Sequence, residues 1–219
     1  MQILAALALA ATIVSPAVAR SAAPQLTGFP DSFIWQNEPA DWKLDRGDTL
    51  TITAANKTDW FAWPGGGSRQ DASPRLLFRV ADDFMISTKV TTLAHSTYDA
   101  GCLAMYGTAT SWAKFCLEAL DDGRLAVVSV VTRDLSDDVT SFPVEGRSAW
   151  LKMAKVDRVI MLYASADGSN WTIVRKFNLE SPSGFLAGFS AQSPNGKGAT
   201  AIFENFHYRP ERIDMWKLH

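Results

Sequence analysis

The chain has 219 residues and an almost balanced charge, with 21 Lys and Arg against 23 Asp and Glu, three His and two Cys. A net charge of −2 argues against a nucleic-acid partner, and so few His and Cys argue against a Cys/His zinc site. With 47% hydrophobic and 20% charged residues, the chain can bury a core and is not disordered. We therefore expect a globular protein without a cofactor or a metal site.

The N-terminal segment Met1–Ala19 has the features of an export signal. It carries no charge, its apolar run Ile3–Val14 is too short to span a bilayer, and Ala17–Ala19 is typical of a signal-peptidase site before Arg20. No Lys or Arg precedes the apolar run, and the alternative is a buried helix. The sequence predicts export to the periplasm or the extracellular space. Residues 20–219 are expected to form one domain without a membrane-spanning segment.

The rest of the chain is a succession of short predicted strands, and no helix is expected. Runs rich in Val, Ile, Thr, Phe and Trp alternate with clusters of Gly, Asp, Asn, Ser and Pro. This spacing favours an antiparallel β-sandwich or barrel. The predicted strands are Thr49–Ala54, Leu76–Val80, Phe84–Leu93, Gly101–Tyr106, Trp112–Leu120, Arg124–Thr132, Ala149–Lys155, Arg158–Ser165, Trp171–Asn178, Phe185–Ala191 and Ala199–Tyr208.

The two cysteines lie in consecutive predicted strands. If these strands pair around a turn near Ala109, Cys102 and Cys116 face each other. A disulfide fits strand spacing at some such positions. The equal alternative is a pair of buried free thiols that pack as small hydrophobic residues.

The Asp122-Gly123 dipeptide predicts a two-residue hairpin turn and with it a strand register. Side chains alternate between the two faces of a strand, so the register assigns each residue to a face. The polar face would hold Trp112, Lys114, Cys116 and Glu118, opposite Arg133, Val131, Ser129 and Val127. The core face would hold Phe115, Leu117, Val128 and Val130.

Carboxylates inside strands are candidates for acid–base chemistry. Glycosidic bond hydrolysis normally uses two carboxylates. Glu118 and Glu204 are the two that lie well inside predicted strands, and Glu118 could pair with Asp99 on a neighbouring strand. Lys114 would then hold one of the pair ionised. The alternative is a surface ion pair between Glu118 and Lys114 that contributes little energy.

Aromatic residues are candidates for sugar stacking. The chain has eight Trp and four Tyr, and Trp60 and Trp63 lie beside Pro64 and the triple glycine Gly65–Gly67. An indole ring on such a loop can stack on a sugar, whereas the alternative is packing in the core. The three His residues support no catalytic triad. Asp137 and Asp138 could contribute to a calcium site, but without an EF-hand spacing.

Several segments of the sequence, in this order, resemble an uncharacterised concanavalin A-like family. Its members include YesU-like bacterial proteins and fungal enolase-regulation-like proteins. The resemblance runs from about residue 28 to 208 and implies a jelly-roll sandwich that holds ligands on its concave face. The segments are Trp35-Gln36-Asn37-Glu38-Pro39, Thr58-Asp59-Trp60-Phe61, Tyr98-Asp99-Ala100-Gly101, Trp112-Ala113-Lys114 through Glu118, Ser129-Val130-Val131-Thr132 and Ser136-Asp137.

The sequence departs from the family pattern at Ala100, which stands near the family's Gln, and at Cys116, where small residues are usual. Asp138-Val139 stands where the family has Trp-Ser in one loop. The Glu-x-Asp-x-x-Glu strand of hydrolytic relatives is missing, which argues against their retaining mechanism.

Three functional hypotheses follow. The first is a glycan-binding or glycan-processing accessory protein with an oligo- or polysaccharide as its partner; Trp112→Ala would abolish sugar binding with little change in melting temperature. The second is a polysaccharide hydrolase or lyase in which Glu118 or Lys114 transfers a proton and Arg133 neutralises a uronate. The third is a protein-interaction sandwich. The first hypothesis lines the concave face with Trp60, Asp99, Trp112, Lys114, Glu118 and Arg133.

Overall fold

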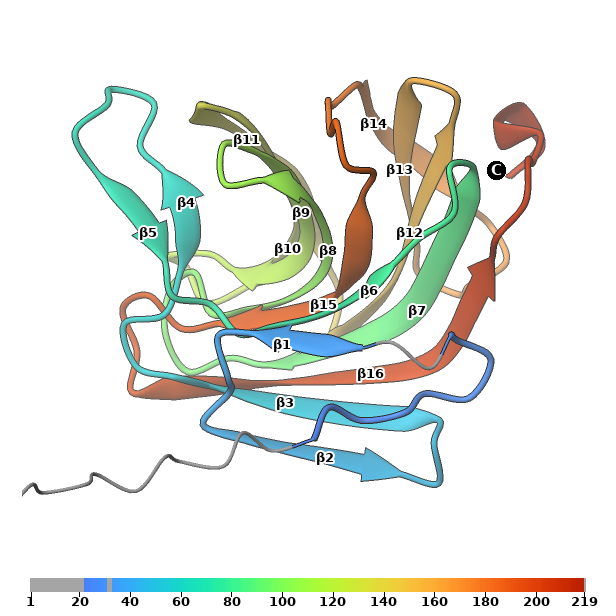
Figure 1. Cartoon of the computed structure of the whole chain (residues 1–219). Helices are drawn as coiled ribbons and strands as arrows, with labels where there is room; N and C mark the ends of the chain where they lie inside the picture. The colour runs from blue at the N-terminus through green and yellow to red at the C-terminus, as the bar shows by residue number, and fades with distance from the viewer. Residues whose placement is uncertain (1–21, 31–32, 219) are drawn as a thin grey trace, which may run out of the picture.

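A computed structural model describes residues 22–30 and 33–218, and their strands form two antiparallel seven-stranded sheets packed as a sandwich (Figure 1). The predicted all-β jelly-roll sandwich is confirmed. The segment Met1–Ala19, read as a signal, lies outside the described residues. No helix in the described ranges is long and apolar enough to cross a membrane.

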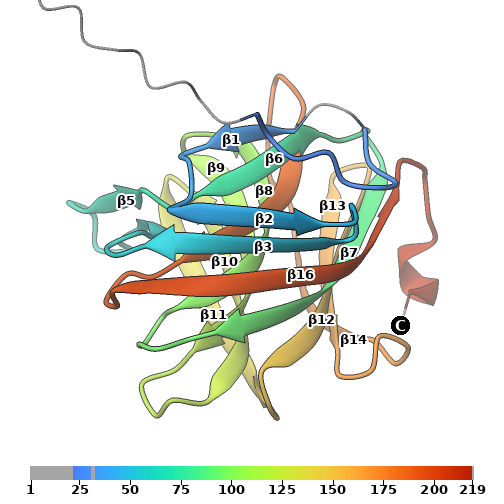
Figure 2. The same cartoon turned by 90° about the horizontal axis from the view of Figure 1, so that it is seen from below.

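Sheet A has the strand order β1-β6-β15-β8-β9-β10-β11, and sheet B has the order β14-β13-β12-β7-β16-β3-β2. Figure 2 shows the strands of sheet B side by side. Sheet A consists of β1 (Ile34–Gln36), β6 (Arg75–Arg79), β8 (Ala100–Thr108), β9 (Ser111–Ala119), β10 (Leu125–Arg133), β11 (Leu135–Val144) and β15 (Leu186–Gln192). Sheet B consists of β2 (Asp41–Asp45), β3 (Thr49–Ala55), β7 (Phe84–Leu93), β12 (Ser148–Val156), β13 (Val159–Ser165), β14 (Thr172–Phe177) and β16 (Gly198–Arg209).

Two small elements lie outside the sheets. The hairpin of β4 (Trp60–Ala62) and β5 (Arg69–Asp71) extends from the sandwich at the side of β8–β11. A short 3₁₀ helix, η1 (Met215–Lys217), follows β16 and packs Met215 into an apolar cluster on the outer face of sheet B.

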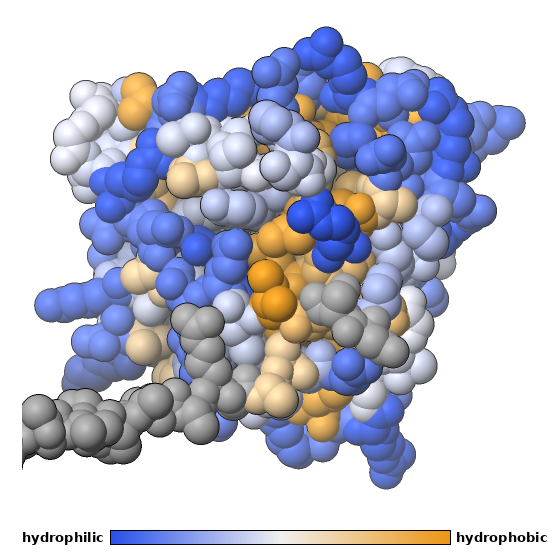
Figure 3. Space-filling model, viewed as in Figure 1, coloured by the Kyte–Doolittle hydropathy of each residue, from blue (hydrophilic) through white to orange (hydrophobic). Residues whose placement is uncertain are grey.

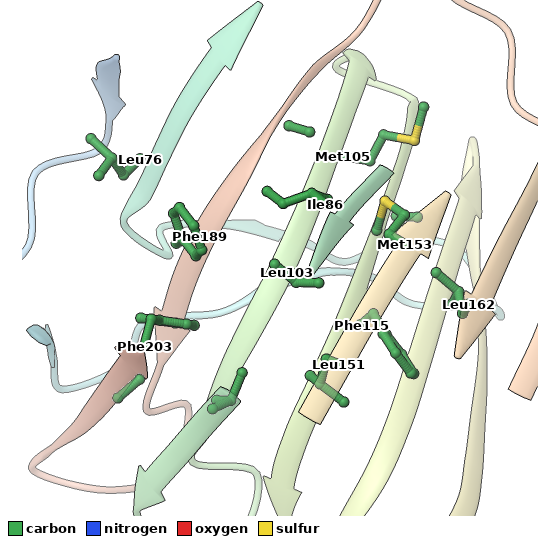
Figure 4. Packing of buried hydrophobic residues seen from close by; sticks show 14 of the residues in the cluster. Leu76, Ile86, Leu103, Met105, Phe115, Leu151, Met153, Leu162, Phe189 and Phe203 are labelled. Atoms are coloured by element: carbon green, nitrogen blue, oxygen red, sulfur yellow. The ribbon is translucent and has the colours of Figure 1, made fainter. Parts of the chain in front are cut away.

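The core lies between the two sheets. Alternation along each strand turns one row of apolar side chains inward, and their removal from water stabilises the sandwich. Figure 4 shows Leu103 and Phe115 of sheet A packed opposite Leu151 and Met153 of sheet B. The outer surface is mainly hydrophilic in the view of Figure 3, with hydrophobic residues gathered near the middle.

The turn between β9 and β10 is one residue longer than predicted. Leu120 donates to the carbonyl of Arg124 (2.8 Å), and Gly123 occupies the left-handed region with φ 81°. Asp121–Gly123 thus forms a three-residue loop, a type that also favours glycine at its last position.

The longer turn shifts the register of β10 by one residue. Glu118 lies opposite Ala126 and Trp112 opposite Thr132, not opposite Val127 and Arg133. A slip of one residue turns each side chain of a strand to the other face. The predicted faces of β9 are therefore right and those of β10 are reversed: Val127 and Val131 belong to the core, and Val128 and Val130 to the outer face.

We expect Gly123→Ala to lower the free energy of unfolding by about 1 kcal/mol, because an L-residue adopts positive φ at a cost. A Cβ at this position meets nothing within 4 Å, so the backbone conformation is the only source of the effect. Urea denaturation measures the change. Asp121→Ala in the same exposed loop is the control and should stay within about 0.5 kcal/mol of the wild type; equal effects of the two substitutions would contradict the turn.

Candidate functional site

The outer face of sheet A carries buried polar side chains beneath the β4–β5 hairpin. Strands β8–β11 form an arc whose hollow side faces this hairpin (Figure 1). Alternation along β9 turns Lys114 and Glu118 to this outer face, where they are only 2% and 8% exposed. They form one group with Asp59, which precedes β4, and Gln192, which ends β15. We call these four residues the polar cluster.

Hydrogen bonds connect the members of the polar cluster. The Lys114 ammonium donates to Asp59 Oδ1 (3.0 Å) and to Gln192 Oε1 (2.7 Å). Gln192 Nε2 donates to Glu118 Oε2 (3.3 Å) and to the carbonyl of Tyr98 (2.9 Å). The amide of Gln192 thus turns its oxygen to the cation and its nitrogen to the carboxyl group, and it bridges Lys114 and Glu118.

A small residue on the intervening strand makes this bridge possible. Ala100 of β8 lies opposite both Gln192 of β15 and Glu118 of β9. Its methyl group leaves space above the sheet, so the two longer side chains meet over it. On the other side of the face, Asp138 of β11 lies two strands from Lys114, across Val130.

The surroundings of Glu118 set its protonation. Burial raises the pKa of Glu118 from 4.5 to about 7, partly offset by the positive charge of Lys114; the carboxylates of Asp59 and Asp138 raise this pKa further. Desolvation disfavours the charged form of a carboxyl group. Glu118 therefore titrates near neutral pH, where a carboxyl group can both give and accept a proton.

Trp60 and Trp112 are not accessible to a sugar, which corrects the prediction that they stack on one. Their rings stack on each other, with centroids 4.0 Å apart, and both residues are buried. The guanidinium of Arg75 lies 4.4 Å from the Trp60 ring. The physical reason is the β4–β5 hairpin, which folds over β9 and places the two indoles face to face.

Asp99 and Arg133 do not join the polar cluster either. Asp99 is fully buried; Oδ2 accepts from the backbone N–H groups of His95 and Ser96, and Oδ1 from the hydroxyl of Ser193. Its carboxylate therefore stabilises the turn before β8. Arg133 is exposed at the end of β10, where it donates to the carbonyl of Asn178 (2.8 Å), because the register shift turns it away from the outer face.

Of the six predicted site residues, Lys114 and Glu118 are thus the two that belong to the polar cluster. Sequence reasoning missed the site roles of Asp59 and Gln192, although Asp59 lies in one of the segments that carry the family resemblance. Gln192 can be found only from the strand order. Two exposed aromatic residues are close in sequence to the cluster or in contact with it. Trp63 lies in the β4–β5 loop, four residues after Asp59, and Tyr98, before β8, accepts a hydrogen bond from Gln192 through its carbonyl.

A disulfide joins Cys102 and Cys116, which lie directly opposite each other on β8 and β9. Of the two alternatives left open by the sequence, the structure contains the bonded one. Cys116 lies between Lys114 and Glu118 on the outer face, so the disulfide crosslinks the floor of the site. In the described ranges, no group of three or more His, Cys, Asp or Glu is arranged to hold a metal ion.

Comparison with known proteins shows relatives of the same fold. "Regulation of enolase protein 1" of Saccharomyces cerevisiae is 24% identical over 173 residues, which are 78% of this chain and 86% of that protein. A functionally unknown protein from S. cerevisiae superposes with a TM-score of 0.77 at 23% identity, over 83% of this chain and 98% of that one. The xylan β-1,4-xylosidase of Bacillus halodurans matches with a TM-score of 0.57 at 15% identity, over 74% of this chain and 32% of its own.

These yeast relatives contradict the predicted export. Both are yeast proteins, and one is named for the regulation of enolase, which conflicts with a periplasmic or extracellular location. The predicted location in the periplasm or the extracellular space is therefore wrong, whereas the interpretation of Met1–Ala19 as a signal peptide stays a prediction.

The resemblance to fungal enolase-regulation-like proteins is confirmed, whereas the YesU-like label stays a prediction. The model of the family described as "Protein of unknown function (DUF1349)" matches residues 35–211, and the chain belongs to this family.

Proposed function

We propose that the outer face of sheet A binds a carbohydrate at the polar cluster. The observation that carries the proposal is the buried hydrogen-bond network of Lys114, Gln192 and Glu118, which lies on the outer face of the sheet and not in the core. Burying charged groups costs desolvation energy, and apolar residues of similar size would pack there at lower cost. A carboxyl group whose pKa is raised as that of Glu118 is typical of binding and catalytic sites.

The chemistry of the cluster suits a polyhydroxylated ligand. A sugar hydroxyl both donates and accepts. Asp59, whose side chain is 20% exposed, and Glu118, 8% exposed, offer carboxyl groups to it, and the more deeply buried Lys114 and Gln192 hold these two groups in place.

Trp63 and Tyr98 add exposed aromatic rings, whose faces can pack on the C–H groups of a sugar. Of the tryptophans considered for stacking from sequence, we thus keep Trp63, and Tyr98 takes the place of Trp60 and Trp112. The fold shared with about a third of a xylosidase chain supports the proposal.

We expect Trp63→Ala to weaken carbohydrate binding by about tenfold, since one aromatic contact with a sugar is worth on the order of 1.4 kcal/mol. Calorimetric titration against xylan, cellulose, pectin, alginate and chitin oligosaccharides measures the affinity. Trp216→Ala is the matched control, because Trp63 and Trp216 are 58% and 59% exposed and Trp216 lies in η1.

Equal binding by the two tryptophan variants would contradict the assigned face. A wild-type protein that binds no member of the panel would contradict carbohydrate binding itself and favour a protein-interaction sandwich.

A second candidate function, proton transfer to or from a bound polysaccharide, is favoured by the pKa of about 7 for Glu118. Asp59 or Asp138 would supply the second carboxylate of a hydrolytic pair. Arg133 cannot neutralise a uronate in this site, since it points elsewhere. Mass spectrometry of the titrated panel tests the idea: oligosaccharides released by the wild type and not by Glu118→Gln would support catalysis, and binding without release would leave a binding protein.

A further inference from the structure

A pocket of about 430 Å³ lies on the outer face of sheet B, on the opposite side of the sandwich from the polar cluster. Residues of β12, β7 and β16, three strands that lie side by side in Figure 2, line its floor. The registers place Lys152 and His207 on either side of Ser87, so the three side chains form a row across the strands. Trp150 and Trp171 also line the pocket, whose volume lies in the range of small-molecule sites.

Lys152 is the least expected residue of this pocket. It is only 6% exposed, and its ammonium lies 3.7 Å from the centre of the Trp171 ring and donates to the carbonyl of Leu218 (3.1 Å). No ion pair among the described residues includes Lys152. Burial lowers the pKa of Lys152 to about 8. A buried cation without an acidic partner in the described chain is stabilised by any anion that enters the pocket.

The other lining residues add hydrogen-bond donors and no acidic group. His207 and Arg209 are basic, Arg209 being paired with Glu211, and the lining contains neither Asp nor Glu. Ser87 is almost fully buried and brings a hydroxyl group to the floor.

The aromatic wall of the pocket is held in place by a tight turn. A Cβ at Gly168 would lie 2.7 Å from a ring atom of Trp150, so the turn backbone packs against the indole. Both Trp150 and Trp171 remain partly exposed. The wall therefore offers flat apolar surface next to the cation of Lys152.

From this arrangement we infer that the outer face of sheet B holds a second binding site, for a small ring-bearing anion. Such a ligand carries a carboxylate or phosphate on a sugar or aromatic ring. The anionic group pairs with Lys152 and accepts from Ser87 and His207, while the ring packs on Trp150 and Trp171. The site is independent of carbohydrate binding at the polar cluster.

Calorimetric titration of the full chain with glucuronate, glucose 6-phosphate and adenosine monophosphate tests the inference, with glucose and inorganic phosphate as controls. At least one ring-bearing anion should bind at least tenfold more tightly than both controls. Comparing the affinities for glucuronate and glucose 6-phosphate shows whether the site prefers a carboxylate or a phosphate. Comparing adenosine monophosphate with glucose 6-phosphate shows whether it prefers an aromatic base or a sugar ring.

Lys152→Met should weaken this binding at least tenfold, since it removes the cation and keeps the apolar stem. Lys176→Met is the matched control, because the Lys176 ammonium also lies over an indole, that of Trp216 (4.1 Å), outside the pocket. Lys114→Met, on the other sheet, should bind the anion like the wild type.

In the wild type, the NMR signals of the Lys152 side chain should shift on binding and its pKa should rise, a readout that does not depend on the variant folding. Absence of binding, equal affinity for glucose, an unchanged affinity of Lys152→Met or unshifted Lys152 signals would overturn the site.

Discussion

Trp112→Ala is expected to lower the free energy of unfolding by about 3–5 kcal/mol, the usual cost of truncating a buried tryptophan. Trp112 is 1% exposed, stacks on Trp60 and packs with Leu77, Ala104 and Val130. The substitution leaves a cavity where the β4–β5 hairpin meets β9. The melting temperature should fall by about 10 °C for a chain of this size, a result opposite to that expected from the sequence, which placed this indole on an open sugar-binding face.

Thermal and urea denaturation measure the effect, and Trp63→Ala is the control. The exposed ring of Trp63 packs little, so its loss should change the unfolding free energy by no more than about 0.5 kcal/mol. A Trp112→Ala protein that melts within two or so degrees of the wild type would show that the stacked pair is not part of a packed interior.

Glu118→Gln is expected to stabilise the protein at pH 8 by on the order of 1–3 kcal/mol and to have little effect at pH 4. The pKa of Glu118 is about 7 in the folded protein, above its ordinary value of 4.5. Between these two values the unfolded chain has released the proton and the folded protein retains it. The stability that Glu118 contributes is therefore full below pH 4.5 and is lost as the pH rises to about 7.

The size of the effect follows from the pKa difference, since each unit is worth about 1.36 kcal/mol, less what the lost contact with Gln192 contributes. Glutamine keeps the shape of the side chain and cannot ionise. Urea denaturation of both proteins at pH 4, 6 and 8 gives the difference in their free energies of unfolding. The contributions of the other carboxylates are the same in both proteins and cancel in this difference.

Glu204→Gln is the matched control for Glu118→Gln. Glu204 also lies inside a strand, but it is partly exposed and lies 3.8 Å from the Lys89 ammonium. Its substitution should change the stability by no more than about 0.5 kcal/mol at each pH. A Glu118→Gln variant that is less stable than the wild type at pH 8 would contradict the claim that the ionised carboxyl group of Glu118 destabilises the fold. A change in stability that is the same at pH 4, 6 and 8 would contradict it as well.

The sequence predicts the sandwich well because its inner strands carry strong signals. The apolar run Phe84–Leu93 forms β7, and the alternating segment that begins at Trp112 lies in β9, both inside their sheets. The spacing of the two cysteines matches the pairing of β8 with β9. Edge and hairpin strands lack this signal: β11 is mostly exposed and β5 is wholly exposed, so neither shows an apolar face that a pattern could detect.

The site is less predictable from sequence, for three physical reasons. The Asp-Gly dipeptide suits both a two-residue and a three-residue loop. The three-residue loop that forms exchanges the two faces of β10 relative to the prediction and turns Arg133 away from the outer face. The burial of Trp60 and Trp112 depends on where the β4–β5 hairpin folds, which no local pattern encodes. Gln192 reaches Glu118 only because β15 and β9 flank β8, a neighbourhood set by the topology of the whole sheet.

The most direct test of the proposed site is an NMR titration of isotope-labelled protein with the oligosaccharide that the panel binds most tightly. We predict that the perturbed signals are the side chains of Lys114, Glu118 and Gln192 and the indole of Trp63, while those of Trp150 and Trp171 stay unchanged. Perturbations on the outer face of sheet B alone, or on no residue of the polar cluster, would contradict a carbohydrate site on sheet A.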